Sequence, residues 1–277
     1  MSLSVLIVVV AIAVGAGFFG SLLGLGGGLF VVPLLTTLLG TPTHEAIGAS
    51  IVAVIASSSA GGATYLRRRV VNVRLGMTLE LATVAGAILG ALTGTALAPR
   101  ALNAVFGLVL AYTGVTMWRG RRKEDAVYIP TSKPTDRDFS YYDPQQGADV
   151  RYRVRNMPAG LSVGLVAGYV SGLLGIGGGL FKVPAMTLLM GIPLRVATAT
   201  STFMIGVTAT ASAYIQYAHG FINPVLTAPV VVGVVVGALG GPRLAQRLPV
   251  ATLRRIFVVV LIVFAVDMLG KAALGVG

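Results

Sequence analysis

Two copies of one glycine-rich motif carry the residues best suited to chemistry. The first copy runs Leu22-Leu-Gly-Leu-Gly-Gly-Gly-Leu-Phe-Val-Val-Pro33, and the second runs Leu173-Leu-Gly-Ile-Gly-Gly-Gly-Leu-Phe-Lys-Val-Pro184, 151 residues later. Each glycine inside a helix costs about 1 kcal/mol relative to alanine, so we expect the helix to break at each triplet. The helices that restart at Leu29 and Leu180 would point free N–H groups and a positive dipole end at the break, and this chemistry binds anions.

Lys182 adds a positive charge to the second motif, where the first motif has Val31. It lies inside an apolar stretch, and a charge at such a position is a functional hypothesis by default. We expect its ammonium group to face a bound anion. The alternative is a lysine that extends towards the membrane surface without touching a substrate.

Small hydroxyl side chains complete the candidate site. Ser50 and Ser201 are equivalent in the two copies, and Thr200 lies beside the second. They can donate hydrogen bonds to anion oxygens, although serine and threonine also join membrane helices, and the glycines too have an alternative role in close helix packing. The candidate anion-binding residues are Gly26, Gly27, Gly28, Leu29, Phe30, Ser50, Gly177, Gly178, Gly179, Leu180, Phe181, Lys182, Thr200 and Ser201.

The remaining polar residues offer no catalytic group. Glu80 could relay protons, but we favour an interfacial carboxylate near Arg74, and Asn72 and Asn223 are interpreted as helix N-caps. The chain has no cysteine and two histidines, and no pair of acids is placed for hydrolysis. We therefore expect no enzyme activity, no metal site and no cofactor.

Composition predicts an all-α, polytopic membrane protein. Of 277 residues, 55% are hydrophobic and 11% are charged, and residues 119–155 hold nine of the 21 Lys and Arg and six of the nine Asp and Glu. Three remaining acids cannot cover a soluble surface of this size, so most of the surface must face a lipid bilayer. The basic residues border apolar runs instead of forming one stripe, which excludes nucleic acid as a partner.

The apolar runs predict two repeats of five membrane segments each, residues 1–118 and 158–277, joined by a charged linker, residues 119–157. Small residues recur at helical spacing in both repeats, for example Gly86 and Gly90 in the first and Gly237 and Gly241 in the second, and we interpret them as helix-packing positions. The expected segments are 3–23, 29–40, 43–66, 76–98 and 101–118, then 158–174, 180–191, 195–217, 224–247 and 252–270.

The positions of the basic residues predict the orientation. With the linker in the cytoplasm, 18 of the 21 Lys and Arg fall on the cytoplasmic side, and both termini fall outside the cell membrane. The loop with Arg67 and Arg74 then lies inside, whereas its equivalent, from His219 to Asn223, lies outside. The repeats are therefore expected to have inverted topology, with the helices broken at the Gly-Gly-Gly motifs. Such repeats are typical of secondary transporters, whose sites lie between the repeats near the middle of the membrane.

The duplicated motif and the central polar loop resemble the TauE/SafE family of sulfite exporters and related sulfur-anion permeases. The resemblance implies a secondary transporter for sulfite or a small organosulfonate, held between the two helix N-termini. A passive anion channel with the same site is the alternative. Related thiosulfate-uptake proteins rely on cysteines, which this chain lacks. The coupling ion (H⁺ or Na⁺) and a homodimer are left open.

Overall fold

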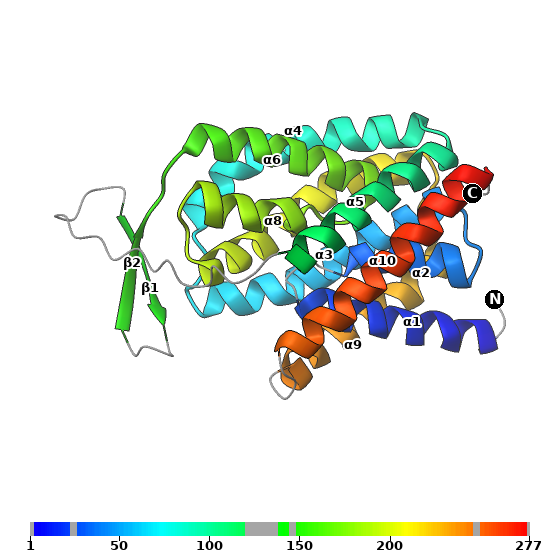
Figure 1. The fold of residues 1–277 in the computed structure, drawn as a ribbon, viewed down its shortest axis with the longest axis horizontal. Coiled ribbons are helices and arrows are strands. Elements are labelled where there is room, and N and C mark those ends of the chain that lie inside the picture. Colours follow the sequence, from blue (N-terminus) through cyan, green and yellow to red (C-terminus); the bar gives the residue numbers. More distant parts are fainter. Residues whose placement is uncertain (1–2, 23–26, 120–137, 144–147, 246–249, 276–277) are drawn as a thin grey trace.

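The computed structural model describes residues 3–22, 27–119, 138–143, 148–245 and 250–275, and within them the chain is helical apart from one β-hairpin (Figure 1). The first half contains α1 (Leu3–Leu22), α2 (Gly28–Leu38), α3 (Thr43–Arg67), α4 (Val73–Ala96) and α5 (Pro99–Arg119). The second half contains α6 (Met157–Leu174), α7 (Gly179–Pro184) continued by the π-helix η1 (Ala185–Leu189), α8 (Leu194–Ala218), α9 (Pro224–Ala245) and α10 (Val250–Leu274).

The all-α prediction is confirmed, and each expected segment coincides with a helix to within a few residues. Among the described residues, α3, α4 and α6 are long and apolar enough to cross a membrane by length and composition. Shorter apolar helices include Gly28–Leu38 and Gly179–Leu189, the second members of the two broken pairs.

The helices of one half pack mainly on helices of the other half. The offset of 151 residues makes α6 the equivalent of α1, and α9 the equivalent of α4. In the structure α1 packs on α9 and α4 packs on α6, while α3 packs on its own equivalent α8, and α5 on α10. This pairing is what a two-fold relation between the halves requires, and the inverted topology of the repeats stays a prediction.

Glycines let α4 and α6, and likewise α1 and α9, approach each other closely. A Cβ added to Gly90 of α4 would lie 1.9 Å from the carbonyl oxygen of Tyr169 on α6. On the other side of the molecule, a Cβ added to Gly237 of α9 would lie 2.1 Å from the carbonyl oxygen of Val14 on α1. The packing interpretation of these glycines is therefore confirmed, whereas the surroundings of Gly241 lie outside the described residues.

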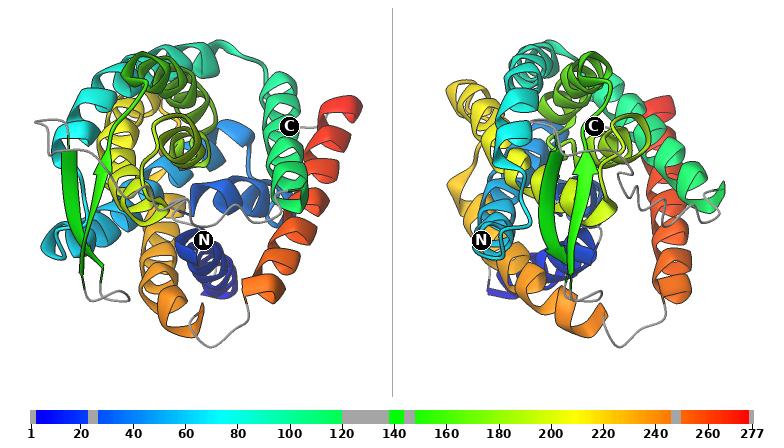
Figure 2. Two further views of the ribbon diagram at one scale, coloured as in Figure 1. Left: turned by 60° about the vertical axis from the view of Figure 1, so that its left-hand side comes forward. Right: turned by 90° about the vertical axis from the view of Figure 1, so that its left-hand side faces the viewer.

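The linker contains a β-hairpin that packs against the helices. Strands β1 (Asp138–Asp143) and β2 (Ala148–Arg153) are antiparallel, and the hairpin stands at one end of the molecule (Figure 2). Tyr152 is buried in a hydrophobic cluster with Met186 and Met190, and its hydroxyl accepts a hydrogen bond from Asn72 Nδ2 at 2.8 Å. Residues 120–137 of the predicted linker lie outside the described residues.

The equivalent helices α4 and α9 are capped by asparagines at opposite ends of the molecule. At the hairpin end, the Asn72 side chain caps α4 by accepting the Leu75 N–H at 3.0 Å, as predicted. At the opposite end, Asn223 donates to Glu45 at 3.4 Å and caps the start of α9 through the Val225 N–H. The start of α1 and the end of α10 lie towards this second end (Figure 1).

Candidate functional site

The helical conformation is interrupted at the first glycine triplet, between α1 and α2. Gly27 has φ of +80°, a left-handed backbone conformation that side-chain-bearing residues rarely adopt. Its carbonyl accepts the N–H groups of Phe30 and Val31 at 3.1 and 3.3 Å, so the N–H groups of Gly28 and Leu29 precede the helical ladder. Gly26 lies outside the described residues.

The helical conformation is interrupted in the same way at the second triplet, between α6 and α7. Gly175, Gly177 and Gly178 have φ of +70°, +81° and +68°, so α6 ends and α7 begins within a few residues. The Gly178 carbonyl accepts the N–H groups of Phe181 and Lys182, both at 3.2 Å. The predicted breaks are therefore confirmed at both motifs.

The two breaks meet at Ser50. Its hydroxyl lies 2.9 Å from the carbonyl oxygen of Gly175 and 3.3 Å from that of Gly28, so one side chain contacts both motifs. A Cβ added to Gly28 would lie 2.7 Å from the Gly175 oxygen, which leaves no room for a larger residue. Because the Ser50 proton is directed at backbone carbonyls, Ser50 joins the breaks and does not offer that proton to an anion in this conformation.

Lys182 points into the helix core and not towards a membrane surface. It is 3% exposed, and its Nζ donates to Thr208 Oγ1 on α8 at 2.8 Å. Glu80 Oε2 on α4 lies 3.7 Å from the same Nζ, and it accepts a hydrogen bond from Thr83 Oγ1 at 2.8 Å. Thr208 Oγ1 also donates to Glu80 Oε1. A buried ion pair with two hydroxyls thus joins α4, α7 and α8.

The interfacial interpretation of Glu80 is wrong. Glu80 is 4% exposed and pairs with Lys182, whereas Arg74 is exposed at the start of the helix. The expected segment began at residue 76, but the Asn72 cap starts α4 at Val73, so Glu80 lies about 10 Å along the helix. The alternative in which Lys182 extends to the surface is also wrong, because its ammonium group is buried.

Most of the other predicted site residues are buried in the core, whereas Leu180 and Phe181 are partly buried. Thr200 Oγ1 accepts the Asn72 N–H at 3.1 Å and so supports the loop between α3 and α4. Ser201 is fully buried, and its hydroxyl has no hydrogen-bond partner among the described residues. Leu29 and Phe30 are buried in the apolar core, and Phe181 stacks on Tyr112 of α5 with ring centres 6.3 Å apart.

Glu80 was expected at the membrane interface, and neither Thr83 nor Thr208 was among the predicted site residues. An acid inside an apolar run is the natural partner for an intramembrane lysine, so Glu80 could have been paired with Lys182 from sequence. The two threonines carry no such signal, since many similar hydroxyls in these helices bond only to their own backbone. Thr210, for example, donates to the Gly206 carbonyl at 2.8 Å.

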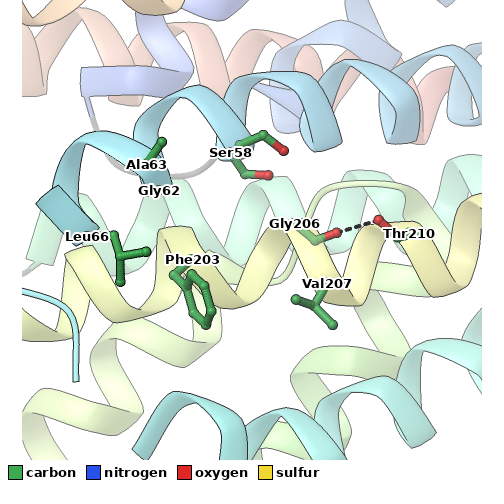
Figure 3. A pocket seen from close by; sticks show the side chains of 9 residues that line it. Ser58, Gly62, Ala63, Leu66, Phe203, Gly206, Val207 and Thr210 are labelled. Carbon is green, nitrogen blue, oxygen red and sulfur yellow. Dashed lines mark hydrogen bonds between the residues drawn. The ribbon is translucent and has the colours of Figure 1, made fainter. Parts of the chain in front are cut away.

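The core around Lys182 is closed. A cavity of about 10 Å³ touches Lys182, Thr83 and Met204, and an oxyanion does not fit in it. A groove of about 330 Å³ lies between α3 and α8, lined by small residues such as Ser58 and Gly206 and by the exposed Val207 and Thr210 (Figure 3). None of the predicted site residues lines that groove.

Family comparison decides the identity of the chain. The profile described as sulfite exporter TauE/SafE matches residues 9–268. The chain belongs to this family. Membership in the TauE/SafE family makes it a membrane transport protein and not an enzyme, as the sequence predicted.

Relatives cover nearly the whole chain. The probable membrane transporter protein YunE of Bacillus subtilis (strain 168) is 26% identical over 270 residues, which are 95% of this chain and 97% of the relative. A probable membrane transporter protein of Xylella fastidiosa (strain Temecula1 / ATCC 700964) is 28% identical over 275 residues, 98% of each chain. No solved structure matches the chain.

Proposed function

We propose that this TauE/SafE protein is a secondary transporter that moves a small sulfur-containing oxyanion, sulfite or a small organosulfonate, across the cytoplasmic membrane. The linker, residues 119–157, faces the cytoplasm, and both termini face outwards. The anion binds where the helices after the two Gly-Gly-Gly breaks begin, with Lys182 as its cationic partner.

The observation that carries the proposal is the buried ammonium group of Lys182, which follows the second break by one helical turn. An ammonium group has three N–H donors, and the hydrogen bond to Thr208 uses one of them. Helix N-termini and a lysine together suit a compact oxyanion, because both supply N–H donors and positive charge.

The closed core favours a carrier over a channel. Lys182 and Glu80 are 3% and 4% exposed, and a cavity of about 10 Å³ beside them is too small for ion passage. A carrier needs such an occluded state between its inward-open and outward-open states, whereas a channel needs a continuous path.

The test is anion affinity in purified Lys182 variants, measured with sulfite and with methanesulfonate. Loss of a hydrogen bond to a charged group costs about 1.5–3 kcal/mol, so Lys182→Ala is expected to weaken binding roughly 10- to 150-fold. Lys182→Arg keeps the charge in a different geometry and retains part of the affinity. Lys182→Glu is expected to be the weakest, because it adds a negative charge beside the substrate.

Lys271→Ala is the matched control, because Lys271 also pairs with an acid but lies partly exposed near the end of α10, 3.0 Å from Asp267. It should bind both anions like the parent protein. Affinities within about two-fold of the parent for both Lys182→Ala and Lys182→Glu, in folded protein, would remove Lys182 from the site.

A further inference from the structure

The Glu80–Lys182 pair carries no net charge when both groups are ionised, so the carboxylate already neutralises the lysine. Glu80 accepts hydrogen bonds from Thr83 and Thr208, and its Oε2 lies 3.7 Å from Lys182 Nζ. Both side chains are buried, so the pair interacts in a medium that screens charge poorly. The protein therefore has a built-in anion, the Glu80 carboxylate, at the place where a substrate anion would bind.

A substrate anion cannot simply be added to this pair. With Glu80 ionised, the site would then contain two negative charges around one ammonium group, and burying an uncompensated charge is costly. If Glu80 takes up a proton, the pair becomes positive, and a monovalent anion restores neutrality. The charge balance thus links one proton to one monovalent anion.

Of the charged side chains on the described parts of α4, α6, α7 and α8, which are Arg74, Glu80, Lys182 and Arg195, only Lys182 lies within ion-pair distance of Glu80. Arg74 and Arg195 lie within the first two residues of α4 and α8. The tyrosines of these helices face other partners or the exterior: Tyr169 bonds to Thr93, and Tyr214 and Tyr217 of α8 are exposed. Among these groups, no other ionisable side chain replaces Glu80 as the partner of the lysine.

We infer that Glu80 is the proton-binding site of the transporter, and that a proton on Glu80 and a monovalent anion on Lys182 bind and cross the membrane together. The inference rests on the proposed function and names its coupling ion as H⁺. With a monovalent anion the loaded site is neutral, so the transport step is electroneutral with one proton per anion.

Thr208 can accommodate both states of Glu80. Its single hydroxyl proton has two acceptors in reach, Glu80 Oε1 and the Met204 carbonyl oxygen at 3.1 Å. When Glu80 is ionised, Thr208 donates to the carboxylate. When Glu80 carries a proton, Glu80 donates to Thr208 Oγ1, and the threonine proton turns to Met204. The two N–H groups of Lys182 that do not bond Thr208 are then available to the anion.

The experiment measures proton movement with methanesulfonate, which stays ionised at every pH used. Purified protein in liposomes that enclose a pH-sensitive dye should acidify the lumen by one proton for each methanesulfonate that enters. Uptake should not respond to an imposed membrane potential. The apparent Kd for methanesulfonate should rise by up to about ten-fold per pH unit on the alkaline side, as linkage to one proton requires.

Glu80→Gln imitates the protonated carboxyl group in shape and charge. It should still bind and exchange methanesulfonate, with no proton movement and with an affinity that no longer depends on pH. Because this substitution leaves Lys182 without its anion, the double variant Glu80→Gln, Lys182→Met supplies a neutral pair, and it should fold but lose anion binding.

Asp267→Asn is the matched control. Asp267 also accepts from a threonine, Thr37, at 2.6 Å and pairs with a lysine at 3.0 Å, but it lies partly exposed near the end of α10. This variant should keep one proton per anion. One proton per anion in Glu80→Gln would overturn the assignment to Glu80. Methanesulfonate transport by the parent protein without protons would overturn proton coupling alone, whereas a parent protein that moves neither methanesulfonate nor sulfite would overturn the proposed function as well.

Discussion

At the scale of single residues, Thr208 joins the two charges of the core. It accepts from Lys182 and donates to Glu80, and hydrogen bonds to charged groups contribute about 1.5–3 kcal/mol each. Thr208→Val keeps the shape of the side chain but removes its hydroxyl. We expect this variant to lower the free energy of unfolding by roughly 3–6 kcal/mol, measured by denaturant unfolding in detergent.

Thr210→Val provides the comparison, because Thr210 is exposed on the same helix and bonds to the Gly206 carbonyl of its own helix. Its loss should change the free energy of unfolding by less than about 1 kcal/mol. Equal effects of the two substitutions would show that the ion pair does not depend on Thr208.

Half of this network was predictable from the sequence. Lys182 stood out because a lysine in an apolar segment has few acceptable environments. Glu80 was misplaced because the expected span was counted from residue 76 and not from the Asn72 cap, and a helix that begins at Val73 carries the acid further into the core. Which of many threonines faces a charge depends on how α4 and α8 are rotated against each other, and that rotation is set by tertiary packing.

At the scale of elements, the glycine contacts between α4 and α6 permit a direct test. In Gly90→Ala the new methyl group would lie 1.9 Å from the Tyr169 carbonyl oxygen, so the helices must move apart. Overpacking of this kind costs about 1–3 kcal/mol or more. Gly15→Ala of α1, where nothing lies within 4 Å of the added Cβ, should be neutral or stabilising. Thermal unfolding of both variants in detergent checks the contrast, and an equal melting temperature would contradict the close packing.

The hairpin in the linker should detach at alkaline pH. Burial raises the pKa of Tyr152 from 10.0 to about 12, because the folded state favours the neutral phenol. The corresponding stability is fully present below pH 10 and is lost as pH rises towards about 12, in total roughly 3 kcal/mol. Near-ultraviolet circular dichroism should show this alkaline transition in the parent protein and in Tyr214→Phe, but not in Tyr152→Phe. A transition that persists in Tyr152→Phe would assign it to another group.

The helices were predictable from sequence, whereas the docking of the hairpin was not. Long apolar runs that begin after Asn72, near Pro99 or after Asn223 fix each helix by themselves. The strands are short and highly charged, and what holds them is contact between Tyr152 and the methionines in and beside η1, a separate element of the second half. Contacts of that kind are not encoded in local periodicity.

At the scale of the whole molecule, the two ends should face opposite sides of the membrane. Single cysteines in this cysteine-free chain, at Ser2, Ser140 and His219, should react with an impermeant reagent from outside, inside and outside the cell, respectively. Ser140 is exposed on β1, His219 follows α8 at the opposite end, and Ser2 lies outside the described residues. Labelling of Ser140 and His219 from the same side would contradict the inverted topology.

The packing of α1 on α9, a helix of the other half, has a consequence for the biogenesis of the protein. The ribosome makes α1 first. Its partner α9, which packs closely on it through glycines, begins only at Pro224, after most of the chain has been synthesised. Until α9 has been made, the face of α1 that packs on it lacks this partner, and α4 likewise lacks α6 until that helix has been made. The largest helix interfaces all lie between the halves, so residues 1–118 and 158–277, produced as two separate polypeptides in one cell, should find each other and assemble, whereas either one alone should be degraded.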